Sequence, residues 1–111
     1  MLKEIIKFIE SNNIKIELED KLNTCYDIDL KIIYLNKKHL DSLVKKNYYK
    51  KLGCPNKYKY SFALLHEYAH AKQFNKYGEK SFIIRWWKDD KFQKVANRFA
   101  RRYYKKFMKR R

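Results

Sequence analysis

The sequence predicts an α+β fold in which a small sheet is followed by helices. Alternating apolar and polar residues in the first third of the chain are typical of half-buried strands, and segments after residue 40 carry apolar residues at helical spacing. The chain has 111 residues, of which 45% are hydrophobic and 17% aromatic, with only 2 Gly and 1 Pro. This composition supports one domain with its own core, residues 1–111, and excludes collagen-like, low-complexity and disulfide-scaffold classes.

The first third of the chain predicts one helix and then strands. Residues 2–9 place apolar side chains at helical spacing, which predicts a short amphipathic helix ending near residues 11–13. Residues 14–18 alternate between isoleucine or leucine and charged side chains, as a half-buried strand does. Residues 26–30 alternate again and residues 32–35 form a β-branched, apolar run, so one further strand or two are expected.

The middle of the chain predicts two helices. The first covers residues 40–51 and is stopped by Gly53 and Pro55. The second and most apolar helix covers residues 58–76 and ends at Gly78. Its expected inward side chains are Phe62, Leu65, Ala69 and Phe74.

A long basic helix is predicted at the end of the chain. It follows an apolar connector at residues 82–87, and Asp89 or Asp90 has the side chain of a typical N-cap. The other faces of this helix are basic. Its expected apolar stripe consists of Phe92, Val95, Ala96, Phe99, Tyr103 and Phe107.

The charge of the chain is high and uneven. Lys and Arg number 28 against 12 Asp and Glu, which gives a formal net charge of +16. Residues 1–29 are nevertheless net acidic, and no acidic residue lies between Lys91 and Arg111. Such a basic field attracts polyanions such as nucleic acid, anionic lipid or acidic polypeptide, although a solvated lysine-rich surface accounts for the composition equally well.

The lack of recognisable targeting signals and the pattern of cysteines predict a soluble, cytoplasmic protein. The charged N-terminus lacks the apolar region of a signal peptide, and no stretch approaches the ~20 apolar residues of a transmembrane segment. Cys25 and Cys54 lie far apart and form neither a metal-type nor a redox-type pair. Buried free thiols are therefore expected, with a disulfide as the alternative.

The motif that carries chemistry is His66-Glu67-Tyr68-Ala69-His70 on the most apolar helix. Residues four apart lie on one helical face, so the imidazoles of His66 and His70 can hold one Zn²⁺ ion. Glu67 can then act as general base on a zinc-bound water whose pKa the metal lowers, and this water attacks a peptide carbonyl. The alternative is a helix whose two histidines are merely packed or exposed.

A catalytic zinc needs a third protein ligand and an open coordination position. The one other histidine of the chain is His39, upstream near the end of the predicted strands. The motif alone therefore leaves the third ligand open.

Residues 62–73, together with the helical segment 93–100, resemble the catalytic core of gluzincin metallopeptidases. The similarity is strongest to the membrane-embedded HtpX type and to its minimal soluble relatives, the minigluzincins, and covers roughly residues 30–105. It implies a zincin-like fold with the motif on a central active-site helix, and a zinc endopeptidase that cleaves peptides or proteins.

The resemblance also implies a role for the final helix. In gluzincins this helix supplies a Glu ligand, followed four residues later by an Asp or Asn that supports a zinc-bound histidine. The matching positions here are Gln93 and Asn97. Gln93 departs from the family pattern, and a neutral amide is a poor zinc ligand. Asp89, Asp90 and His39 are the alternative third ligands, although the aspartates also fit plain helix capping.

The resemblance further implies that residues 32–35 form the edge strand bordering the cleft, where substrate would add as an extended strand. The basic and aromatic segment 101–111 fits three roles. It could grip nucleic acid, it could cover the cleft in its own molecule or in a homodimer and keep a peptidase latent, or it could be a solvated helix end. Latency through a C-terminal segment is a feature of minigluzincins, so the resemblance favours latency over nucleic acid.

The sequence thus leads to one principal hypothesis, a minimal soluble zinc metallopeptidase with latent or weak activity. His66, His70 and Gln93 are its candidate metal ligands, and Glu67 is its candidate catalytic base. The main alternative is a zincin-like module with a weak metal site that binds nucleic acid or a regulatory partner through its basic surface. The third possibility is a purely structural α+β domain.

Overall fold

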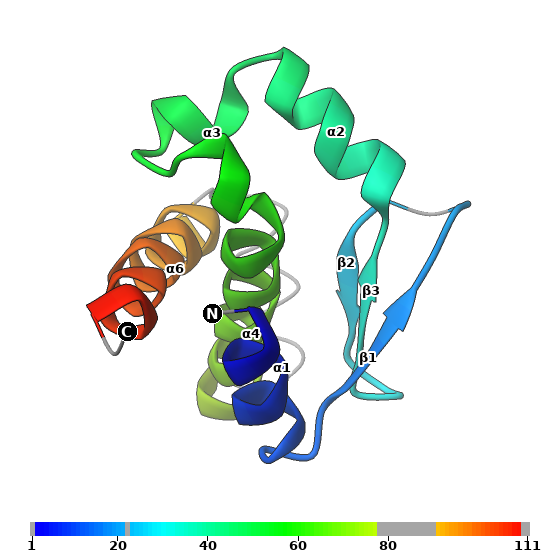
Figure 1. The fold of residues 1–111 in the computed structure, drawn as a ribbon. Coiled ribbons are helices and arrows are strands. Elements are labelled where there is room, and N and C mark those ends of the chain that lie inside the picture. The colour runs from blue at the N-terminus through cyan, green and yellow to red at the C-terminus, as the bar shows by residue number, and fades with distance from the viewer. Residues whose placement is uncertain (1, 22, 78–90, 110–111) are drawn as a thin grey trace.

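A computed structural model describes residues 2–21, 23–77 and 91–109 and has the predicted α+β architecture (Figure 1). The first half contains α1 (Leu2–Glu10), β1 (Lys15–Leu18), β2 (Cys25–Asp27), β3 (Ile32–Leu35), α2 (Lys37–Lys45) and α3 (Tyr48–Lys51). A 3₁₀ turn, η1 (Asn56–Tyr58), then leads into the two long helices α4 (Lys59–Tyr77) and α6 (Lys91–Lys109).

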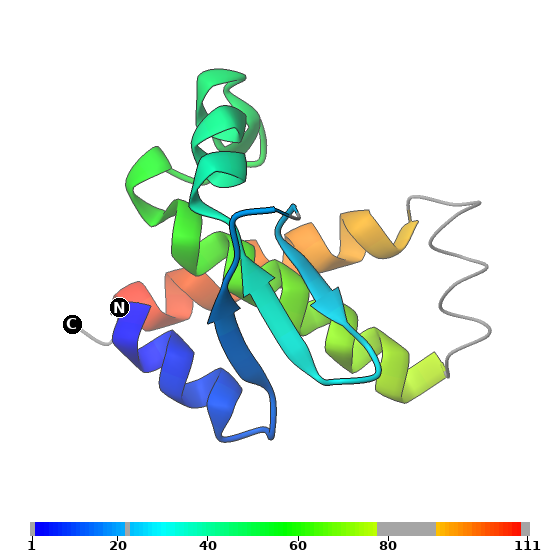
Figure 2. The same cartoon turned by 90° about the vertical axis from the view of Figure 1, so that its right-hand side faces the viewer.

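The sheet has the strand order β1-β3-β2, so β3 is its central strand. β1 pairs with β3 in parallel, and β2 pairs with β3 antiparallel, with Cys25 opposite Tyr34 (Figure 2). The prediction that residues 32–35 form an edge strand is therefore wrong. A tight turn, in which the Lys31 N–H donates to the Asp27 carbonyl over 2.9 Å, folds β2 back along β3 and leaves β2 as the edge.

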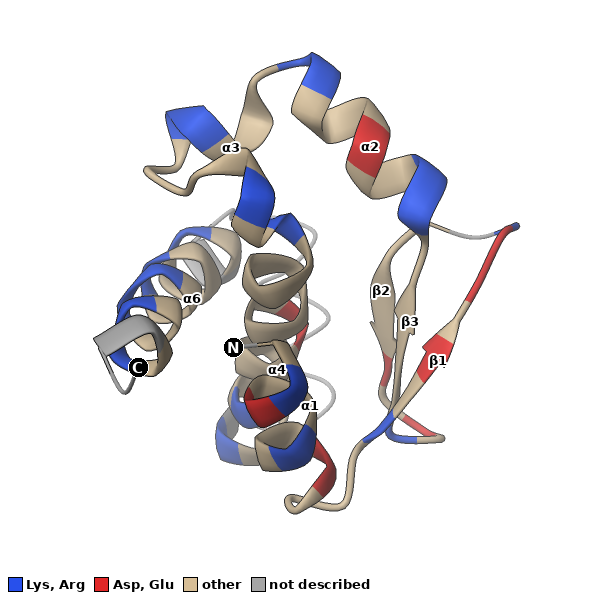
Figure 3. Ribbon diagram, in the orientation of Figure 1, with Lys and Arg blue, Asp and Glu red and all other residues tan. Residues whose placement is uncertain are grey.

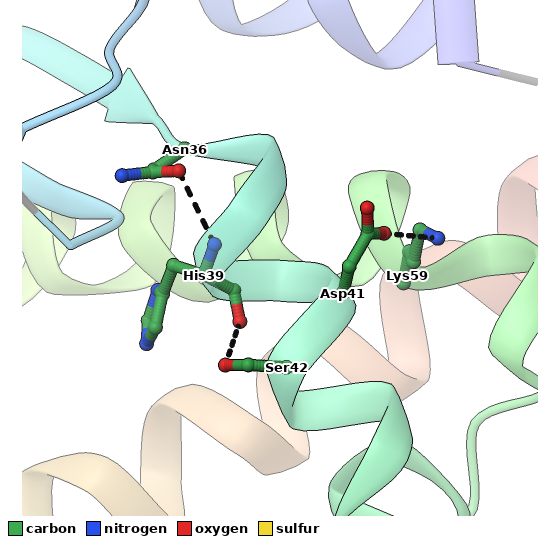
Figure 4. Close-up of polar contacts among 5 residues, drawn as sticks. All are labelled: Asn36, His39, Asp41, Ser42 and Lys59. Atoms are coloured by element: carbon green, nitrogen blue, oxygen red, sulfur yellow. Dashed lines mark hydrogen bonds and ion pairs between the residues drawn. The ribbon is translucent and has the colours of Figure 1, made fainter.

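The single helix predicted for residues 40–51 is divided into α2 and α3 by Asn47. This residue adopts a left-handed conformation with φ 58°, which asparagine tolerates better than most side chains. α2 also begins earlier than predicted, because the side chain of Asn36 caps it. The Asn36 Oδ1 accepts a hydrogen bond from the backbone N–H of His39 over 3.2 Å (Figure 4).

α4 is the central helix of the fold. It packs against β2 and β3, against α1 and most extensively against α6, so that it lies between the sheet and α6 (Figure 1). The predicted inward residues Phe62, Leu65 and Ala69 are buried, whereas Phe74 is partly exposed. The largest fully buried side chains of the described core are Tyr49, Phe62, Ile5, Ile9, Ile33, Leu40, Leu64, Leu65 and Cys54.

α6 turns a stripe of small and aromatic side chains towards the core. Ala96 and Ala100 are fully buried, and Tyr104 and Phe107 are nearly so. The Tyr104 hydroxyl donates to the Gly53 carbonyl over 3.0 Å. Val95, predicted as part of the stripe, is 43% exposed, so that prediction is wrong: the stripe continues through Ala100 and Tyr104 instead.

Several predicted features lie outside the described residues. These are the helix end at Gly78, the connector at residues 82–87 and the caps Asp89 and Asp90; of Phe92, only the backbone is described.

Both cysteines are free thiols. Cys54 is buried, as predicted, while Cys25 on β2 is partly exposed. None of the helices in the described part of the chain is long and apolar enough to cross a membrane.

The packing of α6 predicts that its C-terminal turns contribute to the stability of the fold. Phe107→Ala should lower the free energy of unfolding by about 3 kcal/mol, because it removes a buried ring that packs against Phe8 at a centroid distance of 5.9 Å. Val95→Ala on the same helix should change it by less than about 0.5 kcal/mol. Urea unfolding followed by circular dichroism measures both, and equal effects would contradict this packing.

Candidate metal centre

The two histidines of the motif lie on α4 and face two amide side chains on α6. His66 Nδ1 is 2.7 Å from Asn97 Oδ1, and His70 Nε2 is 3.2 Å from Gln93 Oε1. Residue numbers rise along α4 while those of the contacting residues fall along α6, so the helices run antiparallel here. The spacing of four residues, one helical turn, is the same on both helices and matches the two pairs.

Three potential ligand atoms converge at this point. The Nε2 atoms of His66 and His70 are 3.1 Å apart, and Oε1 of Gln93 lies 3.2 Å from the latter. The Gln93 side chain also contacts His66. Two ligands at 2.0–2.1 Å from a tetrahedral Zn²⁺ ion would be about 3.3 Å apart. The two distances from His70 Nε2, to His66 Nε2 and to the amide oxygen, are therefore close to those in a zinc ligand set.

The other nitrogen of each ring is held by an amide. Asn97 Oδ1 accepts from His66 Nδ1 over 2.7 Å, and Gln73 Oε1 accepts from His70 Nδ1 over 2.8 Å. With its proton on Nδ1, each neutral imidazole presents the Nε2 lone pair to the convergence point. This is the outer-shell arrangement that orients histidine ligands in metal sites.

The third side chain, Gln93, is neutral. Rotation of its amide exchanges Oε1 for an NH₂ group, which would donate to the imidazoles, so one side chain can serve both a metal-bound and a metal-free centre. Among the described residues, no group of three or more His, Cys, Asp or Glu side chains could hold a metal ion. Asp89 and Asp90 are outside the described residues.

The environment keeps both imidazoles neutral. Burial, reinforced by the neighbouring His70, lowers the pKa of His66 to about 4, and burial also lowers the pKa of His70. Neutral imidazole is the form that binds metal ions. Protons therefore compete little with a metal at this site down to mildly acidic pH.

Glu67 lies beside the two histidines on α4. It lines a cavity of about 240 Å³ together with His66, Gln93, His39 and the aromatic residue Tyr48. Burial raises the pKa of Glu67 to about 8, so in the absence of a nearby cation this carboxyl group holds its proton at neutral pH. A carboxyl with a pKa near 8 in a cavity has the proton affinity that general acid–base chemistry requires.

His39 lines the same cavity from α2. Its Nδ1 accepts a hydrogen bond from the backbone N–H of Thr24 over 3.1 Å, so the neutral ring carries its proton on Nε2. The Thr24 Oγ1 in turn accepts from the N–H of Asn36 over 3.0 Å, and Asn36 caps α2. In this tautomer neither ring nitrogen offers a free lone pair, so His39 is a hydrogen-bond donor at the cavity and a poor candidate for the third ligand.

Two residues of the candidate site were not predicted from the sequence. Gln73 is hydrogen-bonded to His70. It follows that candidate ligand by three residues and so lies on the same face of the helix, and this spacing could have indicated the contact from the sequence. Tyr48 lines the cavity and is hydrogen-bonded to Asn97, but nothing in the sequence distinguishes it from the other tyrosines. Asn97, by contrast, was predicted as the support of a histidine, and its side chain lies in that position.

The basic C-terminal segment was expected to cover the cleft, to bind a partner or to be solvated. In its described part, residues 101–107, Tyr103 and Phe107 pack against Phe8 of α1, and Tyr104 reaches Gly53. None of these residues lines the cavity that contains Glu67.

Comparisons of the chain with models of known protein families, with curated protein sequences and with solved structures find no match. The function is therefore argued from the geometry of the site itself.

The raised pKa of Glu67 predicts a pH-dependent stability. The folded state keeps this proton up to about pH 8, whereas the unfolded chain releases it near pH 4.5, so this group makes folding less favourable as pH rises through that window. Glu67→Gln should therefore be increasingly stabilising relative to wild type between pH 5 and pH 8, by up to about 4 kcal/mol. Melting temperatures in the presence of a chelator measure the difference, and a constant difference across this range would contradict a buried, protonated Glu67.

Proposed function

We propose that the protein is a zinc-dependent metallopeptidase of the gluzincin type, with His66, His70 and Gln93 as metal ligands and Glu67 as general base. The observation that carries the proposal is that His70 Nε2 lies 3.1 Å from His66 Nε2 and 3.2 Å from the amide oxygen of Gln93, beside a cavity lined by the carboxyl group of Glu67. A structural role for a buried histidine pair would not require an open cavity next to it.

The donor set fits a zinc ion held less tightly than in a site with a third, anionic ligand. Two imidazole nitrogens suit Zn²⁺, and the outer hydrogen bonds from Asn97 and Gln73 fix their orientation. The neutral amide of Gln93 adds a weak third ligand. We therefore propose reversible zinc binding and a weak or conditional activity.

A zinc ion at this position would supply Lewis-acid chemistry, polarising the scissile carbonyl and making water more acidic. A positive charge beside Glu67 favours its carboxylate form, which can then take a proton from the attacking water. Once protonated, Glu67 returns this proton to the leaving nitrogen.

Two neighbouring elements fit the binding of an extended peptide. β2 pairs with β3 along one side and, among the described strands, has no partner along the other, so main-chain groups of a peptide could add there. His39 presents its Nε2–H to the cavity, where it could donate to the carbonyl oxygen as negative charge develops on it. We propose both as parts of the substrate site.

Zinc affinity tests the ligand set. Gln93→Glu should bind Zn²⁺ at least about tenfold more tightly than wild type, because it replaces a neutral ligand by an anionic one, and Gln93→Ala should bind more weakly. His70→Ala should lose stoichiometric binding. Competition with a chromogenic chelator at pH 7.5 measures all three, and a Gln93→Glu variant no tighter than wild type would place Gln93 outside the ligand set.

Hydrolysis tests the proposed activity. Zinc-loaded protein should cleave a quenched fluorescent peptide library, and removal of zinc by a chelator should abolish cleavage reversibly. Glu67→Ala should lower kcat by at least about 100-fold while retaining bound zinc, because the general base is lost and the ligands remain.

One further variant tests the proposed role of His39, and another serves as a control. His39→Phe should also lower kcat, by about 100-fold, with zinc content and KM little changed, as expected for loss of a donor to the developing charge. Lys38→Gln, an exposed neighbour, should be neutral. Zinc bound stoichiometrically without cleavage of any peptide, by wild type or by Gln93→Glu, would refute the peptidase and leave only a metal site.

A further inference from the structure

The outward face of α6 carries a row of basic side chains that the proposed peptidase does not use. All of them are exposed. This basic stripe consists of Lys94, Arg98, Arg101, Arg102, Lys105 and Lys106. It lies on the opposite side of the helix from the residues that pack on α4, as Figure 3 shows by the cationic segments along the outer side of α6.

The stripe follows the helical repeat. Lys94, Arg98, Arg101 and Lys105 are spaced by four, three and four residues, so their charges form one line along the axis. At 1.5 Å per residue this line is about 16 Å long. No acidic residue occurs in residues 91–111, so no acid of its own helix neutralises it.

Neighbouring segments extend the positive surface. Arg101 lies over Gly53, where an added Cβ would be 3.5 Å from its Cδ atom, and Tyr104 ties the same turn to α6. The α3–η1 region around Gly53 contributes three further exposed lysines, Lys50, Lys51 and Lys57. The basic surface therefore spans two parts of the chain that are held together by a hydrogen bond.

The acidic residues lie largely elsewhere. Most of them belong to residues 1–29, in α1, the first two strands and their loops (Figure 3). The molecule thus separates its charge, and its positive side would concentrate and orient a polyanion.

The structure favours a nucleic acid over a membrane as the polyanion. An amphipathic helix that inserts into a lipid surface needs a free apolar face, but the apolar face of α6 is buried by Ala96, Ala100, Tyr104 and Phe107. A line of cations with no apolar face beside it is instead suited to successive phosphates along a backbone.

We infer that the basic stripe on α6 binds the phosphate backbone of nucleic acid without sequence preference. This inference does not depend on the metal centre, whose residues lie on other faces of α4 and α6. The contacts are to phosphates, because the stripe contains only Lys and Arg, so affinity should fall steeply with salt and vary little with base sequence.

The test compares two variants of equal net charge. The stripe variant carries Arg98→Gln, Arg101→Gln, Arg102→Gln and Lys105→Gln; the control variant carries Lys15→Gln, Lys31→Gln, Lys38→Gln and Lys45→Gln, exposed positions on the sheet and α2. Binding to a fluorescein-labelled 20-base-pair DNA of mixed sequence, and to a single strand of the same length, is measured by anisotropy from about 50 to 200 mM salt.

Wild type should bind at about micromolar Kd at the lowest salt. The stripe variant should bind at least about tenfold more weakly, and its slope of log K against log salt should be smaller by about 3, because four phosphate contacts are lost. The control variant should stay within about threefold of wild type. If the stripe variant unfolds, a double variant with Arg98→Gln and Lys105→Gln replaces it, because this variant keeps Arg101 against Gly53. It should show about half of the change in slope.

Three results would overturn the inference. One is equal weakening in the stripe and control variants, which would mean that only net charge matters. Another is the absence of binding by wild type at the lowest salt. The last is a stripe-dependent loss of binding to vesicles containing anionic lipid, with binding to nucleic acid unchanged.

Discussion

The packing of α4 against α6 is the constraint on which the rest of the structure depends. Ala96 and Ala100 are fully buried between the two helices, and such small side chains allow helix axes to approach closely. The same antiparallel contact brings Asn97 and Gln93 to the histidines of α4. The hydrophobic core and the candidate metal centre therefore depend on one interface. A substitution that disrupts the packing of either would also disturb the other.

Gln93 would suit the candidate centre both with and without a metal ion. A glutamate at position 93 would strengthen a metal site, but without the metal it would bury a negative charge close to Glu67, whose own carboxyl is already driven to the protonated form by burial. The neutral Gln93 avoids that cost and can hydrogen-bond to the imidazoles when no ion is present. A neutral side chain at position 93 would thus weaken zinc binding and at the same time leave a metal-free form well packed.

The sequence could predict the features that depend on local periodicity. The helical repeat predicted that His66 and His70 share one face, and the resemblance to gluzincins pointed to Gln93 and Asn97; the structure brings these four side chains together. The pairing of strands was harder to predict from the sequence, because the pattern of residues within a strand does not show which strands pair. Here β2 folds back along β3, so β3 becomes the central strand. The backbone conformation of single residues was also not predicted. Asn47 adopts a left-handed conformation and divides a segment whose apolar pattern predicts one continuous helix. The proton position on His39 depends on a backbone group 15 residues away, which no pattern in the sequence could reveal.

α6 serves three purposes with two faces of one helix. Gln93 and Asn97 at the candidate metal centre share the inward face with Ala100 and Tyr104 in the core, whereas Arg98 and Arg101 face solvent. Each residue of an α-helix is turned by about 100° from the one before it. A single inserted or deleted residue in the middle of α6 would therefore rotate every later side chain out of its place, bringing arginines into the core and the tyrosine out of it. A change of length in the middle of α6 should therefore be far more disruptive than the same change in the surface loops around Asn13 and Asn47.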